Sequence, residues 1–136
     1  MAEQLGERLK GGEVIELVSD LGGGKTTFVR GLASGIGSND TVSSPTFTLS
    51  NVYKGKDLTM YHFDFYRLAE PGIMREEIAE VLKDPQAVTI IEWADIVHDV
   101  LPEDRVTMHI TATGETSRHY DITTSERLQY LTKDLV

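Results

Sequence analysis

A chain of 136 residues with 13 basic and 22 acidic side chains can build one layered core but not two domains. Its net charge of −9 at pH 7 repels phosphate backbones, so we expect no strong direct binding to nucleic acid. The absence of cysteine excludes disulfides and thiolate metal sites. No apolar run approaches the roughly 20 residues that span a bilayer, so we expect a cytoplasmic protein with no membrane segment.

Hydrophobic periodicity predicts helices and strands in alternation along the chain. The expected helices are 2–10, 26–36, 76–82 and 125–133, the last capped by Ser125. The expected strands are 13–18, 47–53, 58–66, 87–91, 105–111 and 118–124. The second and third strands, and the last two, are spaced as antiparallel hairpins, and the apolar strand 87–91 is typical of the middle of a covered sheet. This pattern indicates one α/β domain over residues 1–136, a three-layer sandwich with a mixed, mostly parallel sheet.

The stretch SDLGGGKTT, residues 19–27, follows the first strand and opens a helix. Gly22, Gly23 and Gly24 leave backbone N–H groups unobstructed, which suits a phosphate chain bound at a helix N-terminus. Lys25 would supply a cation to the β and γ phosphates, and the Thr26 hydroxyl would be a ligand of Mg²⁺. The order strand, glycine-rich loop, GKT and helix predicts a P-loop. The alternative is a glycine-rich turn in an ordinary strand–helix unit.

Ser19 stands where the pattern G-x-x-x-x-G-K-[ST] has its first glycine. If the turn at Ser19 needs a positive φ, nucleotide affinity should suffer. If it does not, little is lost.

Hydrolysis needs a second acidic group near the γ-phosphate, and two carboxylates qualify. Glu92 ends the apolar strand, where the carboxyl ends of strands in α/β sheets open into the ligand crevice. Asp64 shares one face of its strand with His62 and Tyr66. The alternatives are a surface Asp64 paired with Arg67 and a Glu92 that only leads a helix; position favours Glu92. His62 is interpreted as a structural histidine.

The polar run TVSSPTFT, residues 41–48, lies between the P-loop helix and the first hairpin. In nucleotide hydrolases a segment at this place often reads the γ-phosphate, and Ser44 and Thr46 have the hydroxyls to do so. A simple entry into the next strand, with Pro45 fixing the turn, is an equal alternative.

Four motifs in register, SDLGGGKTTFVRGLA, SSPTFTL, YHFDFYRL and IIEWAD, resemble the TsaE family, also called YjeE, over nearly the whole chain. This family comprises small bacterial P-loop ATPases required for threonylcarbamoyladenosine at position 37 of tRNA. Its members usually show GDLGAGKTT, so Ser19 and Gly23 depart from the pattern. They also begin with a strand and a Thr-rich segment that we expect to be missing from this chain.

The resemblance implies a P-loop NTPase-like fold, ATP or ADP with Mg²⁺ as cofactors, and a role for each matching residue. Lys25 and Thr26 would take the phosphate and Mg²⁺ roles, with Thr27 beside the phosphates. Glu92 would be the second Mg²⁺ ligand or catalytic carboxylate. Asp64 and Trp93 correspond to positions required for function, and residues 44–46 to a switch-like loop.

The implied role is that of an accessory ATPase acting on the TsaB and TsaD proteins, slow alone and stimulated by these partners. A GTPase would need an N-K-x-D motif, which the sequence lacks. A small-molecule kinase, which would need an arginine-rich lid, and a nucleotide-binding regulatory module without turnover remain as alternatives. Arg118 is a candidate contact for the base or for a partner, or else a solvated strand residue.

Overall fold

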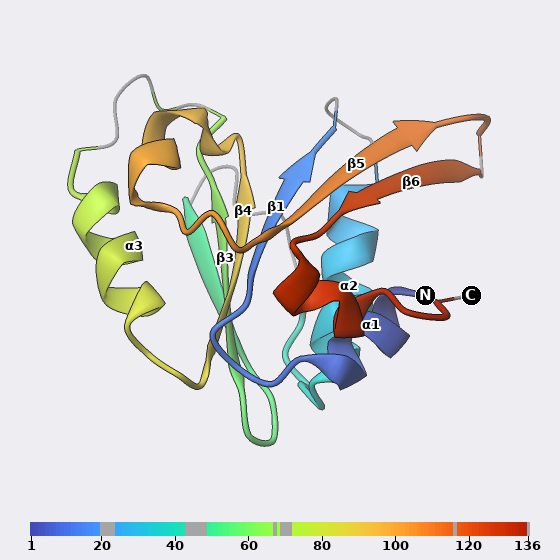
Figure 1. Ribbon diagram of the computed structural model, residues 1–136, viewed down its shortest axis with the longest axis horizontal. Helices are drawn as coiled ribbons and strands as arrows, with labels where there is room; N and C mark the ends of the chain where they lie inside the picture. Colours follow the sequence, from blue (N-terminus) through green and yellow to red (C-terminus); the bar gives the residue numbers. More distant parts are fainter. Residues whose placement is uncertain (20–23, 43–48, 67, 69–71, 116, 136) are drawn as a thin grey trace.

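The computed structural model describes residues 1–19, 24–42, 49–66, 68, 72–115 and 117–135, which form a mixed sheet between two layers of helices (Figure 1). The helices are α1 (Ala2–Arg8), α2 (Lys25–Gly35) and α3 (Met74–Leu82), with the 3-10 helices η1 (Ala94–Val100) and η2 (Glu126–Leu131). The strands are β1 (Val14–Val18), β2 (Ser50–Lys54), β3 (Thr59–Asp64), β4 (Ala87–Glu92), β5 (Val106–Ala112) and β6 (Arg118–Thr123).

The strands form one sheet in the order β2-β3-β4-β1-β5-β6. Strands β3, β4, β1 and β5 run parallel to one another, and β2 and β6 close the two edges as antiparallel hairpin partners. Both predicted hairpins are therefore confirmed. Every residue of β4 is buried, as expected for an apolar strand in the middle of a covered sheet.

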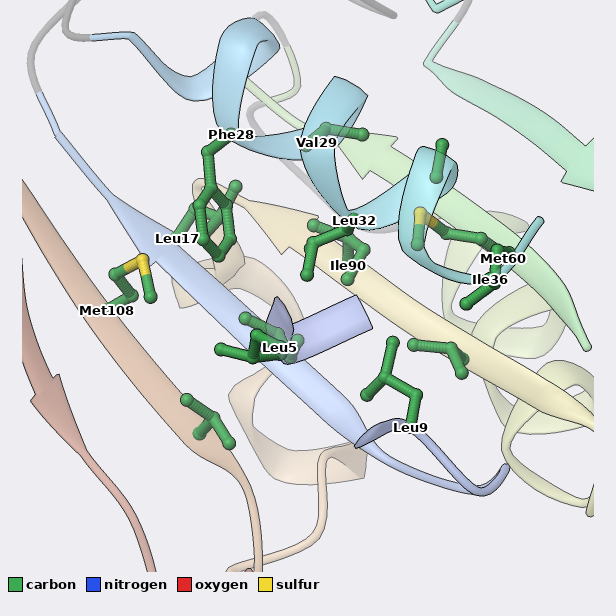
Figure 2. Close-up of a cluster of buried hydrophobic side chains, with 14 of the residues drawn as sticks. Leu5, Leu9, Leu17, Phe28, Val29, Leu32, Ile36, Met60, Ile90 and Met108 are labelled. Atoms are coloured by element: carbon green, nitrogen blue, oxygen red, sulfur yellow. The ribbon is translucent and has the colours of Figure 1, made fainter. Parts of the chain in front are cut away.

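Each face of the sheet has its own hydrophobic core. On one face, α1, α2 and η2 pack over alternate residues of β1, β3, β4 and β5, and Figure 2 shows Leu5, Phe28 and Leu32 meeting Leu17 and Ile90 there. On the other face, α3 and η1 cover the remaining alternate residues, with Ile78 and Val97 fully buried. The three-layer α/β sandwich that the sequence predicts is confirmed.

Helices α1 and α2 cross at unusually close range because glycines face the contact. A Cβ on Gly35 would lie 2.4 Å from the carbonyl oxygen of Glu3, and one on Gly6 would lie 2.5 Å from that of Leu32. Gly31 is equally tight, since its Cβ would meet that of Ala2 at 2.6 Å. This packing fixes the position of α2, whose first residue is Lys25.

Two elements differ from the sequence prediction. The final helix is a 3-10 turn, and the hydroxyl of Ser125 makes no capping hydrogen bond. The buried residues Leu128 and Leu131 of η2 are three apart, and so are Ala94 and Val97 of η1, which was not predicted. Residues at this spacing align on one side of a 3-10 helix, so both turns bury one face in a short segment.

The strand predicted over 58–66 ends at Asp64. Asp64 Oδ1 accepts a hydrogen bond from the backbone N–H of Tyr66 at 3.0 Å, which turns the chain away from the sheet. Leu49, with a φ of 67°, lies just before β2, so this strand begins later than predicted. Residues 47 and 48 lie outside the described residues. None of the described helices is long and apolar enough to cross a membrane.

Candidate phosphate-binding site

The carboxyl ends of three parallel strands meet at one edge of the sheet beside the first turn of α2. In the strand register, Glu92 at the end of β4 lies opposite Leu17 of β1 and Asp64 of β3. Helix α2 begins at Lys25, directly after Gly24. This is the edge at which α/β sheets bind their ligands.

Gly24 makes the turn into α2 with a φ of 96°, in the left-handed region that glycine adopts without steric cost. Its carbonyl accepts the first hydrogen bond of the helix, from the N–H of Phe28 at 3.1 Å. Ser19 is not among the described residues with positive φ, which outside glycine are Leu49, Trp93 and Asp134. The backbone of Ser19, directly after β1, therefore does not adopt the positive φ that would have required glycine.

Lys25 is buried against the sheet edge although it carries a charge. Its side chain is 8% exposed, and Nζ lies 3.4 Å from Oε1 of Glu92. Nζ also donates a hydrogen bond of 3.3 Å to the carbonyl oxygen of Ser19, the residue that follows β1. The cation thus joins the end of β4 to the start of the glycine-rich loop.

Glu92 is held from two sides. While Oε1 faces Lys25, Oε2 lies 2.5 Å from Nε2 of His62, which is fully buried in β3. Of the two candidate carboxylates, the structure brings Glu92 to the lysine. These contacts argue against the alternative that Glu92 only precedes a helix, because its side chain turns into the site and is only 4% exposed.

Trp93 lies between Glu92 and η1, and its φ of 58° is a left-handed conformation that is uncommon for a bulky residue. Its ring centroid lies 5.5 Å from Nζ of Lys25, within the range of a cation–π contact. The ring of Tyr66 packs against it with centroids 5.0 Å apart. Both aromatic side chains are partly exposed, so this pair forms the open wall of the site.

Asp64 is buried, with 2% of its surface exposed, so its alternative interpretation as a surface carboxylate is wrong. It lies opposite Glu92 in the register, and its Oδ1 is bonded to the N–H of Tyr66. Arg67, its suggested partner, lies outside the described residues.

Other predicted site residues divide into two groups. Thr26 and Thr27 occupy the first turn of α2, the former half-buried and the latter exposed. Gly22, Gly23, Ser44 and Thr46 lie outside the described residues, so their predicted roles stay predictions.

The structure brings to the site two residues for which the sequence analysis gave no definite site role. His62 was interpreted as structural, yet it contacts Glu92. Arg118 at the start of β6 lies over the N-terminus of α2, because a Cβ on Gly24 would be 3.2 Å from its Nε. Its Nη1 donates to the carbonyl oxygens of Gly114 and Ser117. Only the strand order, which sets β3 beside β4 and β5 beside β1, brings both residues here.

A separate group of possible metal ligands joins Glu16 of β1 to Asp95 and His98 of η1. There Arg105 Nε donates to Glu16 Oε1 at 3.0 Å, and His98 Nε2 lies 3.3 Å from Glu16 Oε2. An arginine already compensates the one buried carboxylate, so this group is an ion-pair network that ties η1 to β1.

Comparison with known proteins gives a consistent result. The family model described as "Threonylcarbamoyl adenosine biosynthesis protein TsaE" matches residues 1–120. The chain is 36% identical over 131 residues to the tRNA threonylcarbamoyladenosine biosynthesis protein TsaE of Bacillus subtilis, covering 93% of this chain and 79% of that protein. It is 39% identical over 118 residues to the TsaE of Treponema pallidum, covering 87% of each.

A solved structure has the same fold. The crystal structure of Bacillus subtilis YdiB superimposes with a TM-score of 0.75 at 31% sequence identity, covering 96% of this chain and 80% of that one. The family match spans β1, the lysine at the head of α2, and the Glu92 strand that together form the site. The chain therefore belongs to the TsaE family of threonylcarbamoyl adenosine biosynthesis proteins.

Proposed function

We propose that this protein binds ATP with Mg²⁺ at the edge formed by β1, β3, β4 and the start of α2, and hydrolyses it. The observation that carries the proposal is the approach of Lys25 Nζ to Glu92 Oε1, 3.4 Å, at the carboxyl ends of parallel strands. A buried lysine at a helix N-terminus facing a strand-end carboxylate is the arrangement that a phosphate chain and its cation require.

The oxygen donors near Lys25 fit magnesium, because Mg²⁺ prefers carboxylate and hydroxyl oxygens and leaves room for water and phosphate. Thr26 and Glu92 would hold the ion, which when bound neutralises charge on the phosphates. Lys25 exchanges its carboxylate partner for phosphate oxygens, and the N–H groups at the head of α2 donate to the same anion. Glu92 would also orient the attacking water, with Asp64 beside it in the register.

The relatives' names, tRNA threonylcarbamoyladenosine biosynthesis proteins, support a role in the same modification of tRNA. We propose that the modified position is 37, as the family resemblance implies. Because the net charge of −9 opposes direct binding to tRNA, we propose that the protein acts in the cytoplasm through the TsaB and TsaD proteins. The isolated chain would turn over slowly, below the usual range of about 1 to 10³ s⁻¹, and would be stimulated by these partners.

Calorimetric titration with ATP and Mg²⁺, followed by phosphate release with and without TsaB and TsaD, tests this proposal. Lys25→Ala should weaken ATP binding about 10- to 100-fold, as expected for the loss of one charge-assisted contact of about 1.5–3 kcal/mol. Lys83→Ala, a change at an exposed lysine of α3's C-terminal end, serves as the control for loss of one positive charge.

The outcomes separate the alternatives. Unchanged affinity in Lys25→Ala would remove the P-loop assignment. Binding without phosphate release, even with both partners present, would make the protein a regulatory nucleotide-binding module. Transfer of the γ-phosphate to a small acceptor rather than to water would identify a kinase.

A further inference from the structure

His62 is the most deeply buried titratable side chain at the site. It lies in β3 with no exposed surface, between the core residue Met60 and the buried carboxylate Asp64 on the face that α2 covers. Its Nε2 is 2.5 Å from Oε2 of Glu92. An imidazole taken out of water must recover its lost hydrogen bonds, so this contact with a carboxylate is the polar interaction that supports its burial.

The two oxygens of Glu92 have different partners on different elements. Oε2 meets His62 of β3, while Oε1 meets Lys25 of α2. A carboxylate on a strand end has free rotation about its last bond unless something fixes it. Here the β3 imidazole occupies one oxygen and leaves the other directed at the head of α2.

A histidine with a purely structural role would make its hydrogen bonds within the core. Nδ1 of His62 is buried and has no hydrogen-bond partner in the part of the chain that the structure describes. The register places His62 beside Ile90, two pairs before Asp64 and Glu92, so the ring reaches diagonally to Glu92. The ring's polar contact is therefore made toward the site.

We propose that His62 is a positioning residue, which donates a hydrogen bond from Nε2 to Oε2 and thereby orients Oε1 of Glu92 toward Lys25 and the bound phosphate. This inference rests on the proposed function of Glu92 as the carboxylate that acts at the γ-phosphate. A residue that orients a ligating carboxylate in this way typically changes metal affinity or activity by about 10- to 100-fold when it is removed.

Partner-stimulated ATP hydrolysis by His62→Ala and His62→Gln tests the inference. The alanine variant should lose about 10- to 100-fold in kcat while KM for ATP changes by less than about threefold, because Lys25 and the loop still bind the phosphates. The glutamine variant keeps a side-chain N–H donor without a ring, and it should recover kcat to within about threefold of the unaltered protein.

Met60→Ala is the matched control for lost packing. Met60 is fully buried two residues earlier on the same face of β3, so its truncation opens a cavity in the same core. It should lower the thermal midpoint without a comparable loss of kcat. An equal loss of kcat in Met60→Ala and His62→Ala at matched stability, or no rescue by His62→Gln, would overturn the positioning role.

A measurement on the nucleotide-free protein keeps this inference separate from the proposed function. With ¹⁵N-labelled histidine, the Nε2 resonance of His62, assigned from its loss in His62→Gln, should shift in Glu92→Gln while those of the other three histidines do not. An unshifted resonance would refute the contact. If the resonance shifts but the unaltered protein neither binds nor hydrolyses ATP with its partners present, the proposed function fails and the positioning of Glu92 loses its purpose.

Discussion

Replacing Glu92 by glutamine removes the negative charge that faces Lys25 in the nucleotide-free protein. The two groups are 3.4 Å apart, and their attraction is about 5 kcal/mol at an effective dielectric constant of about 20. Most of this is offset by the cost of taking both ions out of water, which is several kcal/mol for each. We expect a net coupling of about 1–2 kcal/mol, within the usual range for residues in contact.

ATP must draw Lys25 away from Glu92 if the phosphates bind where we propose. In the absence of metal, the carboxylate therefore opposes binding twice, by holding the lysine and by repelling the phosphates. Glu92→Gln should bind metal-free ATP about 5- to 30-fold more tightly than the unaltered protein, which is 1–2 kcal/mol expressed as a ratio. With Mg²⁺ present this gain should shrink or reverse, because a ligand of the ion has been lost.

The assay is calorimetric titration of ATP in a chelator-containing buffer, with four proteins: unaltered, Glu92→Gln, Lys25→Ala and the double variant. In the Lys25→Ala background the glutamine should change affinity less than about threefold, since only phosphate repulsion is left to relieve. Glu13→Gln is the matched control, because Glu13 is also buried, changes the net charge equally and lies in a separate network with Tyr130. Weaker metal-free binding by Glu92→Gln, or an equal gain in both backgrounds, would refute the reasoning.

Three further predictions concern packing, pH and spectroscopy. Gly35→Ala should lower the free energy of unfolding by about 1–3 kcal/mol in urea, since its Cβ would lie 2.4 Å from a carbonyl oxygen of α1, whereas Arg30→Ala on the exposed side of α2 should change little. Burial and the hydrogen bond to Glu13 raise the pKa of Tyr130 above its usual value near 10, so stability is full below about pH 10 and falls as the pH rises beyond it. Tyr130→Phe should lose this extra alkaline decline in unfolding measured from about pH 9 to 11, and an identical slope would contradict the assignment. The emission of Trp93, the single tryptophan, should change saturably with ATP or ADP and Mg²⁺ and much less with GTP, because bound phosphates would draw Lys25 away from its ring. An identical emission change in Lys25→Ala would contradict this cation–π explanation.

The sequence predicts the fold well where one local pattern decides the structure. The run of apolar residues in β4 could only be a central strand, and Gly24 followed by Lys25 marks the start of α2 because a left-handed turn needs glycine. The two 3-10 helices were missed or misassigned because leucines or small apolar residues three apart fit either helix type. Tertiary packing over a short segment then selects the tighter one.

The site could be predicted only in part, because its residues come together through the order of the strands in the sheet. Glu92 could be chosen over Asp64 from its place at the end of an apolar strand, and in the structure its Oε1 lies 3.4 Å from Nζ of Lys25. The burial of Asp64 could not be foreseen, because it depends on β3 lying second in the sheet, between β2 and β4. A strand's own sequence does not state which neighbour it will have.

The role of His62 also depends on which strand lies beside β3. Read along β3, it is one polar residue among alternating apolar ones, and a structural histidine is the simpler interpretation. Its meaning changes once β3 pairs in parallel with β4, because the register that sets His62 against Ile90 also brings its ring within 2.5 Å of the carboxylate two residues further on. The long-range pairing of strands thus brings His62 into contact with a carboxylate that faces Lys25. The role of a buried polar residue on the strand next to the Glu92 strand is therefore better judged from the strand register than from its own neighbours in the sequence.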